Sequence, residues 1–599
     1  MAETMKERKD MDPQYMWDLS TLFKNDEEWN NALPELDEMI KKLPEYQGKL
    51  NNAKTIREFF DFDTHLGRKL SDFYCYASLR NCEDTRDSDA QAMEAKAYQV
   101  YTAYATAISF AEPEILSLDE EVLESIVHSE DLKPYAFNMQ KLLDQKPHVL
   151  SAKEEALLAA FTETLGAPSK ISESLQDADM TFESVTDSNG EVHELNQSNY
   201  ILLQMSEDRT LRLNAFKSFY KGFKQHINTF AFTYNACIKE AVAEAQVRHY
   251  ESSRAMSMAY EHVPGVVYDS LVDTVRKFMP EMYRYVRLRK QMLGLDELHY
   301  YDVYTPLVAG SSKSYTYEEA QQMVLDAVTP LGKDYVNRVK QAYKDRWIDV
   351  YPNNGKRDGA FSSGTYDSNP YILTSFTGTL DSVSTIAHEM GHSQHTWLSN
   401  HTQTPQNADY TLFVAEVAST VNENLLVEQL LQKTTEPKER LALLNHYLEG
   451  FKGTVYRQTM FAEFERDAHA MAERGEAITA ASMNTLYKNL IKDYFGEDLV
   501  IDDEVQYEWA RIPHFYRPFY VYKYATSYCA AVALSEAILN NEDGAAKKYL
   551  EFLSMGGSAY PLDELKHAGV DFSTPEPVSR ALTKFSQILD DVEETLKKL

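Results

Sequence analysis

Most of the chain shows the hydrophobic periodicity of amphipathic helices. Apolar residues recur every three to four positions in long stretches rich in Leu, Ala, Glu and Lys, which places them on one face of a helix. The 20 prolines and 22 glycines gather between these stretches, where helices would end. The pattern predicts a mainly α fold. The long helical segments are expected near residues 26–45, 53–80, 88–110, 118–128, 152–163, 206–247 and 266–293.

The helical pattern breaks first at residues 180–195. Two alternating runs flank Asn189-Gly190, a dipeptide that suits the tight turn between antiparallel strands. The segment predicts a β-hairpin.

A second break, at residues 355–377, predicts a small sheet directly before another helical segment. An exposed strand edge can hold an extended peptide through main-chain hydrogen bonds. Tyr371 and Ile372 are the candidates for that contact. The alternative is that these strands only cover the core.

The helix predicted after this sheet has two unlike faces. Its apolar side chains recur at helical spacing, its histidines fall on the opposite side, and polar residues stand where an N-cap would start it. The apolar stripe is Val383, Ile386, Ala387, Met390 and Trp397; the histidines are His388, His392 and His395; the N-cap candidates are Asp381 and Ser382.

His388, Glu389 and His392 form a His-Glu-x-x-His motif on this helix. Residues four apart lie on one face, so the two imidazoles can share one Zn²⁺. Glu389 is rotated aside, where it reaches a water at the metal and acts as general base. Gly391, without a Cβ, lets a backbone or a substrate come close. The alternative is that the histidines only mark the solvated face of an ordinary helix.

A catalytic zinc site needs a third protein ligand. His395 lies on the same face but is displaced by about 10 Å along the helix axis from His388, so it suits a neighbouring or alternative role. Glu416 stands in an apolar helical stretch, where a carboxylate should be paired or metal-bound. Glu423, two turns later, is placed to accept a hydrogen bond from a ligating imidazole. The alternative is that both glutamates form the polar edge of an amphipathic helix.

A tyrosine-rich segment at residues 512–528 offers hydrogen-bond donors for a developing oxyanion. His514 precedes Pro518, which suits the first turn of a helix, and Tyr520, Tyr524 and Tyr528 would then share one face. Tyr522 is a further candidate for substrate contact. The alternative is a packed aromatic face, since the chain holds 39 tyrosines.

Composition and charge indicate the class of protein, its partners and its cellular location. The 599 residues are 43% hydrophobic and 26% charged, as in globular proteins. The net charge of −33 without a basic stripe argues against a nucleic-acid partner. No apolar run is long enough for a membrane span, and the N-terminus lacks a signal-peptide stretch. The four cysteines form no CxxC pair and are expected as reduced thiols in a cytoplasmic protein.

The combined motifs resemble the thimet oligopeptidase family, and most closely its oligoendopeptidase F branch. The resemblance rests on the His-Glu-x-x-His motif, on Glu416 with its apolar neighbours and on Glu423. It extends over most of the chain through Trp17-Asp-Leu, Gly355-Lys-Arg, Gly556-Gly-Ser, Pro561 and Ala568-Gly-Val-Asp571.

The resemblance implies one zinc ion bound by His388, His392 and Glu416, with Glu389 as the base. It also implies that a histidine and tyrosines of a late segment act on the substrate carbonyl, which matches His514 and Tyr524 here. The family has glycines in that segment where this chain has Arg517 and Pro518. The implied fold is two helical lobes that enclose a deep channel admitting short peptides.

We therefore expect a zinc endopeptidase of short peptides, with an N-terminal helical region at 1–200 that includes the hairpin and a catalytic region at 201–599. One alternative is a zinc carboxypeptidase or dipeptidase on a similar fold, which would recruit Arg511 or Arg517 for the substrate carboxylate. The other is a non-enzymatic helical scaffold. The oligomeric state does not follow from the sequence.

Overall fold

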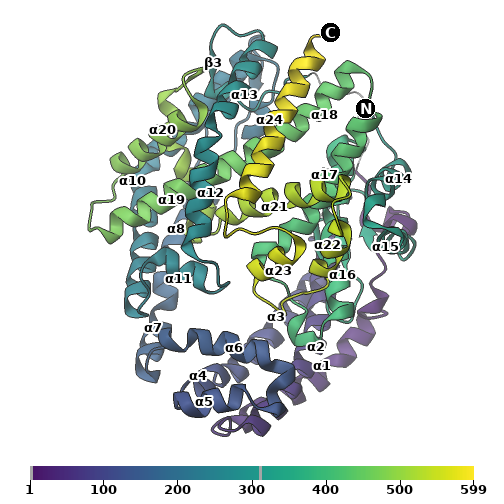
Figure 1. The fold of residues 1–599 in the computed structure, drawn as a ribbon, viewed down its shortest axis with the longest axis vertical. Helices are drawn as coiled ribbons and strands as arrows, with labels where there is room; N and C mark the ends of the chain where they lie inside the picture. The colour runs from purple at the N-terminus through teal and green to yellow at the C-terminus, as the bar shows by residue number, and fades with distance from the viewer. Residues whose placement is uncertain (1–4, 309–312) are drawn as a thin grey trace. The chain divides into compact units, whose positions relative to one another are not determined.

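The computed structural model describes residues 5–308 and 313–599, and helices dominate it (Figure 1). The described residues fall into two compact units that alternate along the chain, so neither unit is a single continuous segment. The boundary predicted at residue 200 divides the chain into two continuous regions, whereas each compact unit combines three separate segments. The boundary therefore stays a prediction. The first four residues of the N-terminal stretch lie outside the described residues.

The first unit comprises residues 1–149, 313–429 and 534–570. Its helices are α1 (Asp26–Ile40), α2 (Ala53–Glu83), α3 (Ser88–Ile108), α4 (Ala111–Leu116), α5 (Glu120–Val127), α6 (Ala136–Gln145), α14 (Tyr317–Ala327), α15 (Lys333–Lys344), α16 (Leu380–Thr402), most of α17 (Leu412–Lys433), the end of α21 (Tyr522–Leu539), α22 (Ala545–Leu553) and α23 (Pro561–Ala568).

The second unit comprises residues 150–312, 430–533 and 571–599. Its helices are α7 (Ala152–Leu165), α8 (Ala167–Ser174), α9 (Tyr200–Gln204), α10 (Arg209–Val247), α11 (Ser253–Ala259), α12 (Gly265–Lys277), α13 (Met279–Met292), α18 (Pro437–Gly450), α19 (Arg457–Glu473), α20 (Ala480–Phe495), most of α21 and α24 (Glu576–Leu596).

The predicted helix at 266–293 is two helices in the structure. α12 ends at Lys277, and α13 begins at Met279 with Pro280 in its first turn. Proline lacks a backbone N–H and clashes with the preceding turn, so it starts a helix more readily than it continues one. The predicted single helix was therefore wrong at this point.

The predicted hairpin is present in the second unit. β1 (Val185–Thr186) pairs antiparallel with β2 (Val192–His193). Gly190 adopts the left-handed region at φ +86°, which the turn requires and glycine tolerates. A second two-residue ladder in this unit joins β3 (Leu298–His299) and β7 (Leu499–Val500) in parallel.

The first unit holds a three-stranded sheet in the order β4 (Ile348–Asp349), β6 (Tyr371–Leu373), β5 (Phe361–Ser363). β4 pairs with β6 in parallel and β5 pairs with β6 antiparallel, with Ser362 opposite Ile372. The sheet packs against α16, so the small sheet predicted beside the motif helix is confirmed.

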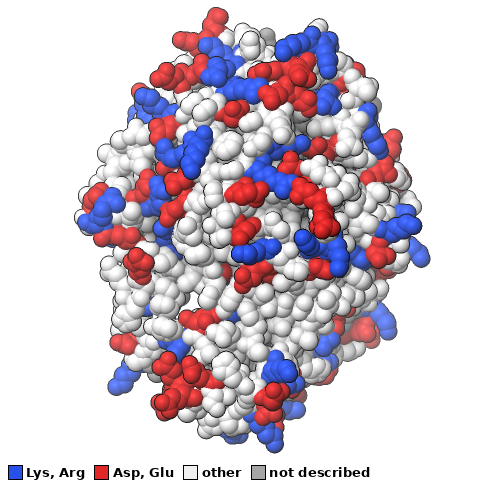
Figure 2. Space-filling view, in the orientation of Figure 1, with Lys and Arg blue, Asp and Glu red and all other residues white. Residues whose placement is uncertain are grey.

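The face of the molecule shown in Figure 2 carries acidic and basic side chains interspersed with one another. Within the described part of the chain, none of the helices is long and apolar enough to cross a bilayer.

Candidate active site

α16 presents the motif histidines side by side. The helix is capped by Thr379, whose Oγ1 accepts the N–H of Ser382 at 3.2 Å, so the cap lies before the predicted Asp381 and Ser382. The imidazole rings of His388 and His392 lie 4.9 Å apart between centroids. The apolar stripe is confirmed on the buried side for Val383, Ile386, Ala387 and Met390, which have at most 1% of their surface exposed, whereas Trp397 is only half-buried.

The carboxylate of Glu416, on α17, completes a three-ligand group. Its Oε2 lies 3.5 Å from Nε2 of His388 and 3.4 Å from Nε2 of His392. Ligand atoms held about 2.1 Å from one ion at the tetrahedral angle are about 3.4 Å apart, so these separations fit a tetrahedral metal site. The two nitrogens and the oxygen all lie within 4.8 Å of one another.

Gly391 allows α17 to come this close to α16. A Cβ at Gly391 would lie 2.5 Å from the carbonyl oxygen of Ala418 and 2.6 Å from Cα of Ser419. Both are backbone atoms that cannot move aside without moving the helix. The expected close approach at Gly391 is therefore confirmed, and the partner is the backbone of the helix that carries Glu416.

Asn422 ties the same pair of helices together farther along. Its Nδ2 donates to the carbonyl oxygen of Ala387 at 3.1 Å, and its Oδ1 accepts the hydroxyl of Tyr335 from α15 at 3.0 Å. Both hydrogen bonds are buried, where an unmade one would be costly. Neither Asn422 nor Tyr335 carried a signal in the sequence, because their partners come from separate segments.

Two further residues, both on α17, hold the ligands in place. Glu423 lies with Oε1 3.4 Å from Nδ1 of His388, opposite the nitrogen that faces Glu416. Ser419 donates its hydroxyl to Oε2 of Glu416 at 3.0 Å. A carboxylate on the far nitrogen fixes the tautomer and the orientation of a ligating imidazole. The geometry thus places Glu423 beside the ligands rather than among them, and sequence reasoning missed Ser419.

The charges of the site oppose the effect of burial. Burial by itself would lower the pKa of His388, but the hydrogen bond to Glu423 and the surrounding carboxylates outweigh it and raise that pKa to about 9. Burial would likewise raise the pKa of Glu416, yet the hydrogen bond and charge of His392 bring it to about 2. These shifts favour a protonated His388 beside an ionised Glu416, and a bound cation would take the place of the imidazole's positive charge.

Glu389 is set apart from these pairs. Only 6% of its surface is exposed, and its Oε2 has no hydrogen-bond partner among the described residues. Burial raises its pKa above the ordinary value, although His388 and His392 pull in the other direction. A buried carboxylate with an open acceptor oxygen and a raised pKa can take up a proton and later release it.

His395 lies outside the ligand group. Its ring stacks on Tyr410 at 3.7 Å between centroids and leans on Phe552 at 5.5 Å, and 1% of its surface is exposed. Burial lowers its pKa to about 3, which keeps the imidazole neutral. The structure therefore makes His395 part of an aromatic stack rather than an alternative ligand or a solvated residue.

The strand predicted to bind substrate was the wrong one. Tyr371 and Ile372 belong to β6, the central strand, and are fully buried; the hydroxyl of Tyr371 donates to the carbonyl oxygen of Asp18 at 2.7 Å. The edge strand is β5. Its Ser362 hydroxyl contacts that of Ser393, one residue after His392, at 2.8 Å. Strand order depends on pairing between segments, so alternation along the sequence did not reveal it.

The predicted late cluster lies in the second unit. His514, Tyr520 and Tyr524 gather there: the His514 ring lies 6.0 Å from that of Tyr524, and Tyr520 lies 5.3 Å from Tyr524. The side chain of His514 is accessible to solvent, although the groups packed around it partly desolvate the ring and so lower its pKa. Neutral imidazole and phenol groups of this kind can donate hydrogen bonds to an oxyanion.

Other details of this segment differ from the prediction. α21 begins at Tyr522, not at Pro518, and the intervening Phe519 adopts a left-handed φ of +56°. Tyr522 is fully buried and packs 5.0 Å from the ring of Tyr268, so its predicted role in substrate contact is wrong. Tertiary packing, rather than helical spacing, decides which of these tyrosines is accessible.

The two arginines that a carboxypeptidase could use to bind the substrate carboxylate contact other side chains within the second unit. Arg511 lies over the ring of Tyr200 and 3.7 Å from Glu508. Arg517 lies 4.4 Å over the ring of Tyr520.

Comparison with known proteins agrees with this geometry. The model of peptidase family M3 matches residues 202–584, and a second family model, described as Oligopeptidase F, matches residues 114–182. Oligopeptidase PepF of Bacillus subtilis is 43% identical over all of this chain and 90% of its own length. Group B oligopeptidase PepB of Streptococcus agalactiae is 40% identical, covering 99% of this chain and 98% of its own.

Two solved structures are similar to this chain over nearly its whole length. A putative peptidase from Chlamydophila abortus superposes with a TM-score of 0.93 at 34% identity, covering 99% of this chain and 100% of its own. Oligoendopeptidase-F from Enterococcus faecium superposes with a TM-score of 0.75 at 36% identity, covering 96% and 100%.

Proposed function

Because the chain belongs to peptidase family M3 and is a metallo-oligopeptidase that cleaves internal peptide bonds, we propose that its metal is zinc, one ion per chain, held by His388, His392 and Glu416. The donor set carries the proposal. Two imidazole nitrogens and one carboxylate oxygen, with the oxygen 3.5 and 3.4 Å from the two nitrogens, are the ligands that catalytic zinc sites use. When bound, the ion supplies Lewis acidity, which lowers the pKa of water at the site and polarises a carbonyl.

The remaining chemistry falls to the side chains around this group. Glu389 takes a proton at its open Oε2 from the attacking water and passes it to the leaving amine. Glu423 holds the ring of His388 by its Nδ1, which leaves Nε2 toward Glu416 as the nitrogen that would bind the ion. His514 and Tyr524 donate hydrogen bonds to the developing oxyanion; this role follows from the family resemblance.

The substrates are short peptides, as expected of an oligopeptidase. A channel that excludes folded proteins belongs to this proposal and follows from the same resemblance. A cytoplasmic location is supported by the cysteines: Cys75, Cys82, Cys237 and Cys529 are all buried and free of disulfides.

The test is Glu389→Gln, assayed on a short peptide that is blocked at both ends and quenched internally. We expect kcat/KM to fall by about 10²–10⁴ while the protein still binds one zinc ion, because the amide cannot accept the proton. A chelator should abolish the wild-type activity, and added zinc should restore it. Full activity of the zinc-loaded variant would overturn the assignment, and failure to cleave the blocked peptide would favour an exopeptidase.

A further inference from the structure

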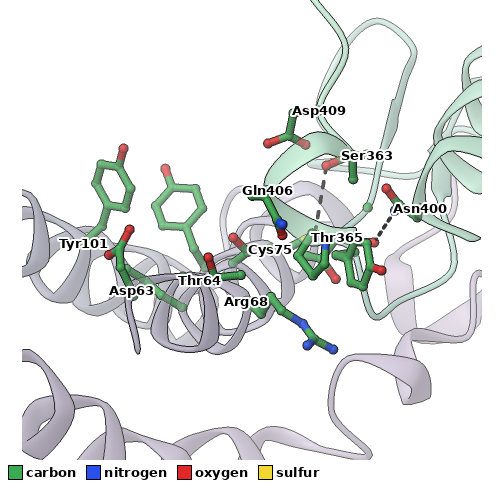
Figure 3. A pocket seen from close by; sticks show the side chains of 18 of the residues that line it. Asp63, Thr64, Arg68, Cys75, Tyr101, Ser363, Thr365, Asn400, Gln406 and Asp409 are labelled. Atoms are coloured by element: carbon green, nitrogen blue, oxygen red, sulfur yellow. Dashed lines mark hydrogen bonds between the residues drawn. The ribbon is translucent and has the colours of Figure 1, made fainter. Parts of the chain in front are cut away.

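A cavity of about 780 Å³ lies within the first unit, beside the C-terminal half of α16. Residues of α2 and α3 form one side, and β5, α16 and the loop before α17 form the other (Figure 3). Figure 3 shows Asp63 and Tyr101 on the first side and Asp409 and Asn400 on the second. None of these residues belongs to the ligand group or to its hydrogen-bond partners.

The cavity adjoins the site through α16 and β5. Thr396 lines it and lies one helical turn, about 6 Å along the axis, after His392. Ser363, the last residue of β5, also lines it, and the preceding Ser362 contacts α16 beside His392. Because β5 is the edge of its sheet, an extended peptide added to it would run along the mouth of the cavity.

The charged groups of the cavity favour a cation. The carboxylate of Asp63 accepts the hydroxyl of Tyr104 at 2.8 Å, and its other oxygen has no protein cation bonded to it among the described residues. Asp409 projects from the opposite side, with Lys141 as a nearby positive charge. Burial raises the pKa of Asp63 to about 6, so an incoming positive charge would offset the cost of burying that carboxylate. Asp409 is solvent-exposed and contributes its negative charge from the opposite side.

Among the described residues that line the cavity, the one cationic side chain is already paired. Arg68 binds Asp367 with two hydrogen bonds of 2.8 and 2.5 Å, and its guanidinium lies 5.0 Å over the ring of Tyr366. Its charge is thus balanced at the rim. Asp63 and Asp409 are left as the negative groups facing the interior.

Tyrosines of α2 and α3 give the cavity an aromatic wall on one side. Tyr98 and Tyr101 remain 62% and 49% exposed, which is unusual for such large side chains, and both line the cavity with Tyr74 and Tyr104. Rings of this kind attract a cation to their faces and cover the aliphatic stem of a long side chain. Carboxylates within an aromatic wall are a combination suited to lysine and arginine.

We propose that this cavity binds a lysine or arginine side chain of the peptide substrate and so sets a preference for basic residues at one position. The inference rests on the proposed function of the neighbouring site. It assigns a specificity-determining role to Asp63 and Asp409, which lie outside the reaction itself.

The test compares peptides that carry either lysine or its uncharged near-isostere norleucine at each position in turn. At one position we expect wild-type kcat/KM to be higher for lysine. In Asp63→Asn the lysine-to-norleucine ratio should fall by about tenfold or more, the ratio that 1.4 kcal/mol represents. The asparagine keeps an oxygen to accept the Tyr104 hydroxyl, so only the charge is removed. Asp409→Asn should lower the same ratio at the same position.

Glu58→Gln is the matched control, because Glu58 is an exposed acid on the same α2 helix and does not line the cavity. Its ratio should equal that of wild type; a fall as large as that of Asp63→Asn would mean a general charge effect and overturn the proposal. An unchanged ratio in Asp63→Asn would also overturn it. Calorimetric binding of both peptides to Glu389→Gln gives the same ratio without turnover, so failure of the proposed function and failure of this proposal are distinguishable.

Discussion

The metal group and the His514–Tyr524 cluster are built by opposite means. On α16 an unbroken helix puts His388 and His392 side by side, and regular backbone hydrogen bonds fix their spacing. The late cluster spans a short 3-10 turn at Pro513–Tyr516, which carries His514, and an irregular stretch that contains Phe519 at φ +56°. The spacing of the two histidines is thus determined locally, and Glu416 joins them from α17, whereas the whole late cluster depends on contacts from distant segments.

Those contacts can be named. The N–H of Phe519 donates to the fully buried carboxylate of Glu465 at 2.8 Å, and Ser257 donates its hydroxyl to the carbonyl oxygen of Pro518 at 2.8 Å. A backbone held in the left-handed region persists only where surrounding structure enforces it. The comparison teaches that a regular helix can set the spacing of two ligands by itself, whereas an irregular segment needs support from elsewhere.

The largest effect is expected at the ligand group. In Glu416→Ala the carboxylate that closes the group is gone, so stoichiometric zinc should be lost and kcat/KM should fall by at least about 10³, which corresponds to ~4 kcal/mol of transition-state stabilisation. Metal analysis by mass spectrometry and the peptide assay measure this. His395→Phe is the control: it preserves the stack on Tyr410 and should retain zinc, and loss of zinc there would contradict the placement of His395.

The late cluster should respond in kcat instead of metal content. Tyr524→Phe removes a proposed oxyanion donor, and we expect kcat to fall by about 10²–10³ with zinc binding intact. Tyr516→Phe is a matched loss of hydroxyl, since Tyr516 bonds to Thr233 at 2.7 Å. It should cost about 1 kcal/mol of stability and leave kcat near wild type. Equal losses of kcat in both variants would make the cluster structural.

Glu423→Gln should weaken the metal site without destroying it. Loss of the charge on Nδ1 of His388 is expected to reduce zinc affinity by about 10–100-fold, measured by competition with a chelator. Asp381→Asn, an exposed acid in the first turn of α16, is the control and should change affinity little. An unchanged affinity in Glu423→Gln would break the assignment.

The metal-free protein offers a pH test of the same contact. The pKa of His388 is raised to about 9, above the ordinary 6.5, so its stabilising contribution is fully present below about pH 6.5 and is lost as pH rises through 9. Metal-free wild type should therefore lose stability over that window, and Glu423→Gln should lose less. Thermal unfolding at several pH values measures the difference, and parallel curves would contradict it.

The smallest effect on activity is expected from a single methyl group between two helices. Gly391→Ala places Cβ against the backbone of Ala418, and we expect a loss of about 1–3 kcal/mol in unfolding free energy together with weaker zinc binding. Gly453→Ala is the control, because nothing lies within 4 Å of a Cβ there. If both variants are as stable as wild type, the close approach of α16 and α17 does not limit the site.

The sequence by itself determined the mainly α fold, the hairpin at Asn189-Gly190 and the paired histidines, and it marked Glu416 as a candidate metal ligand. Each of these depends on local spacing: helix periodicity, turn chemistry, or a carboxylate inside an apolar stretch. At Pro280 two local rules competed, because the periodicity predicted one helix over 266–293 while proline favours a helix start. The prediction from periodicity alone was wrong there.

Only the tertiary structure decided which groups meet. It made β5 rather than β6 the edge strand, buried Tyr522, stacked His395 on Tyr410 and set Glu423 behind His388. It also brought Asp63 and Asp409 to one cavity from distant parts of the chain. The physical reason is that burial and pairing between segments depend on packing across the whole fold, which spacing along one element does not encode.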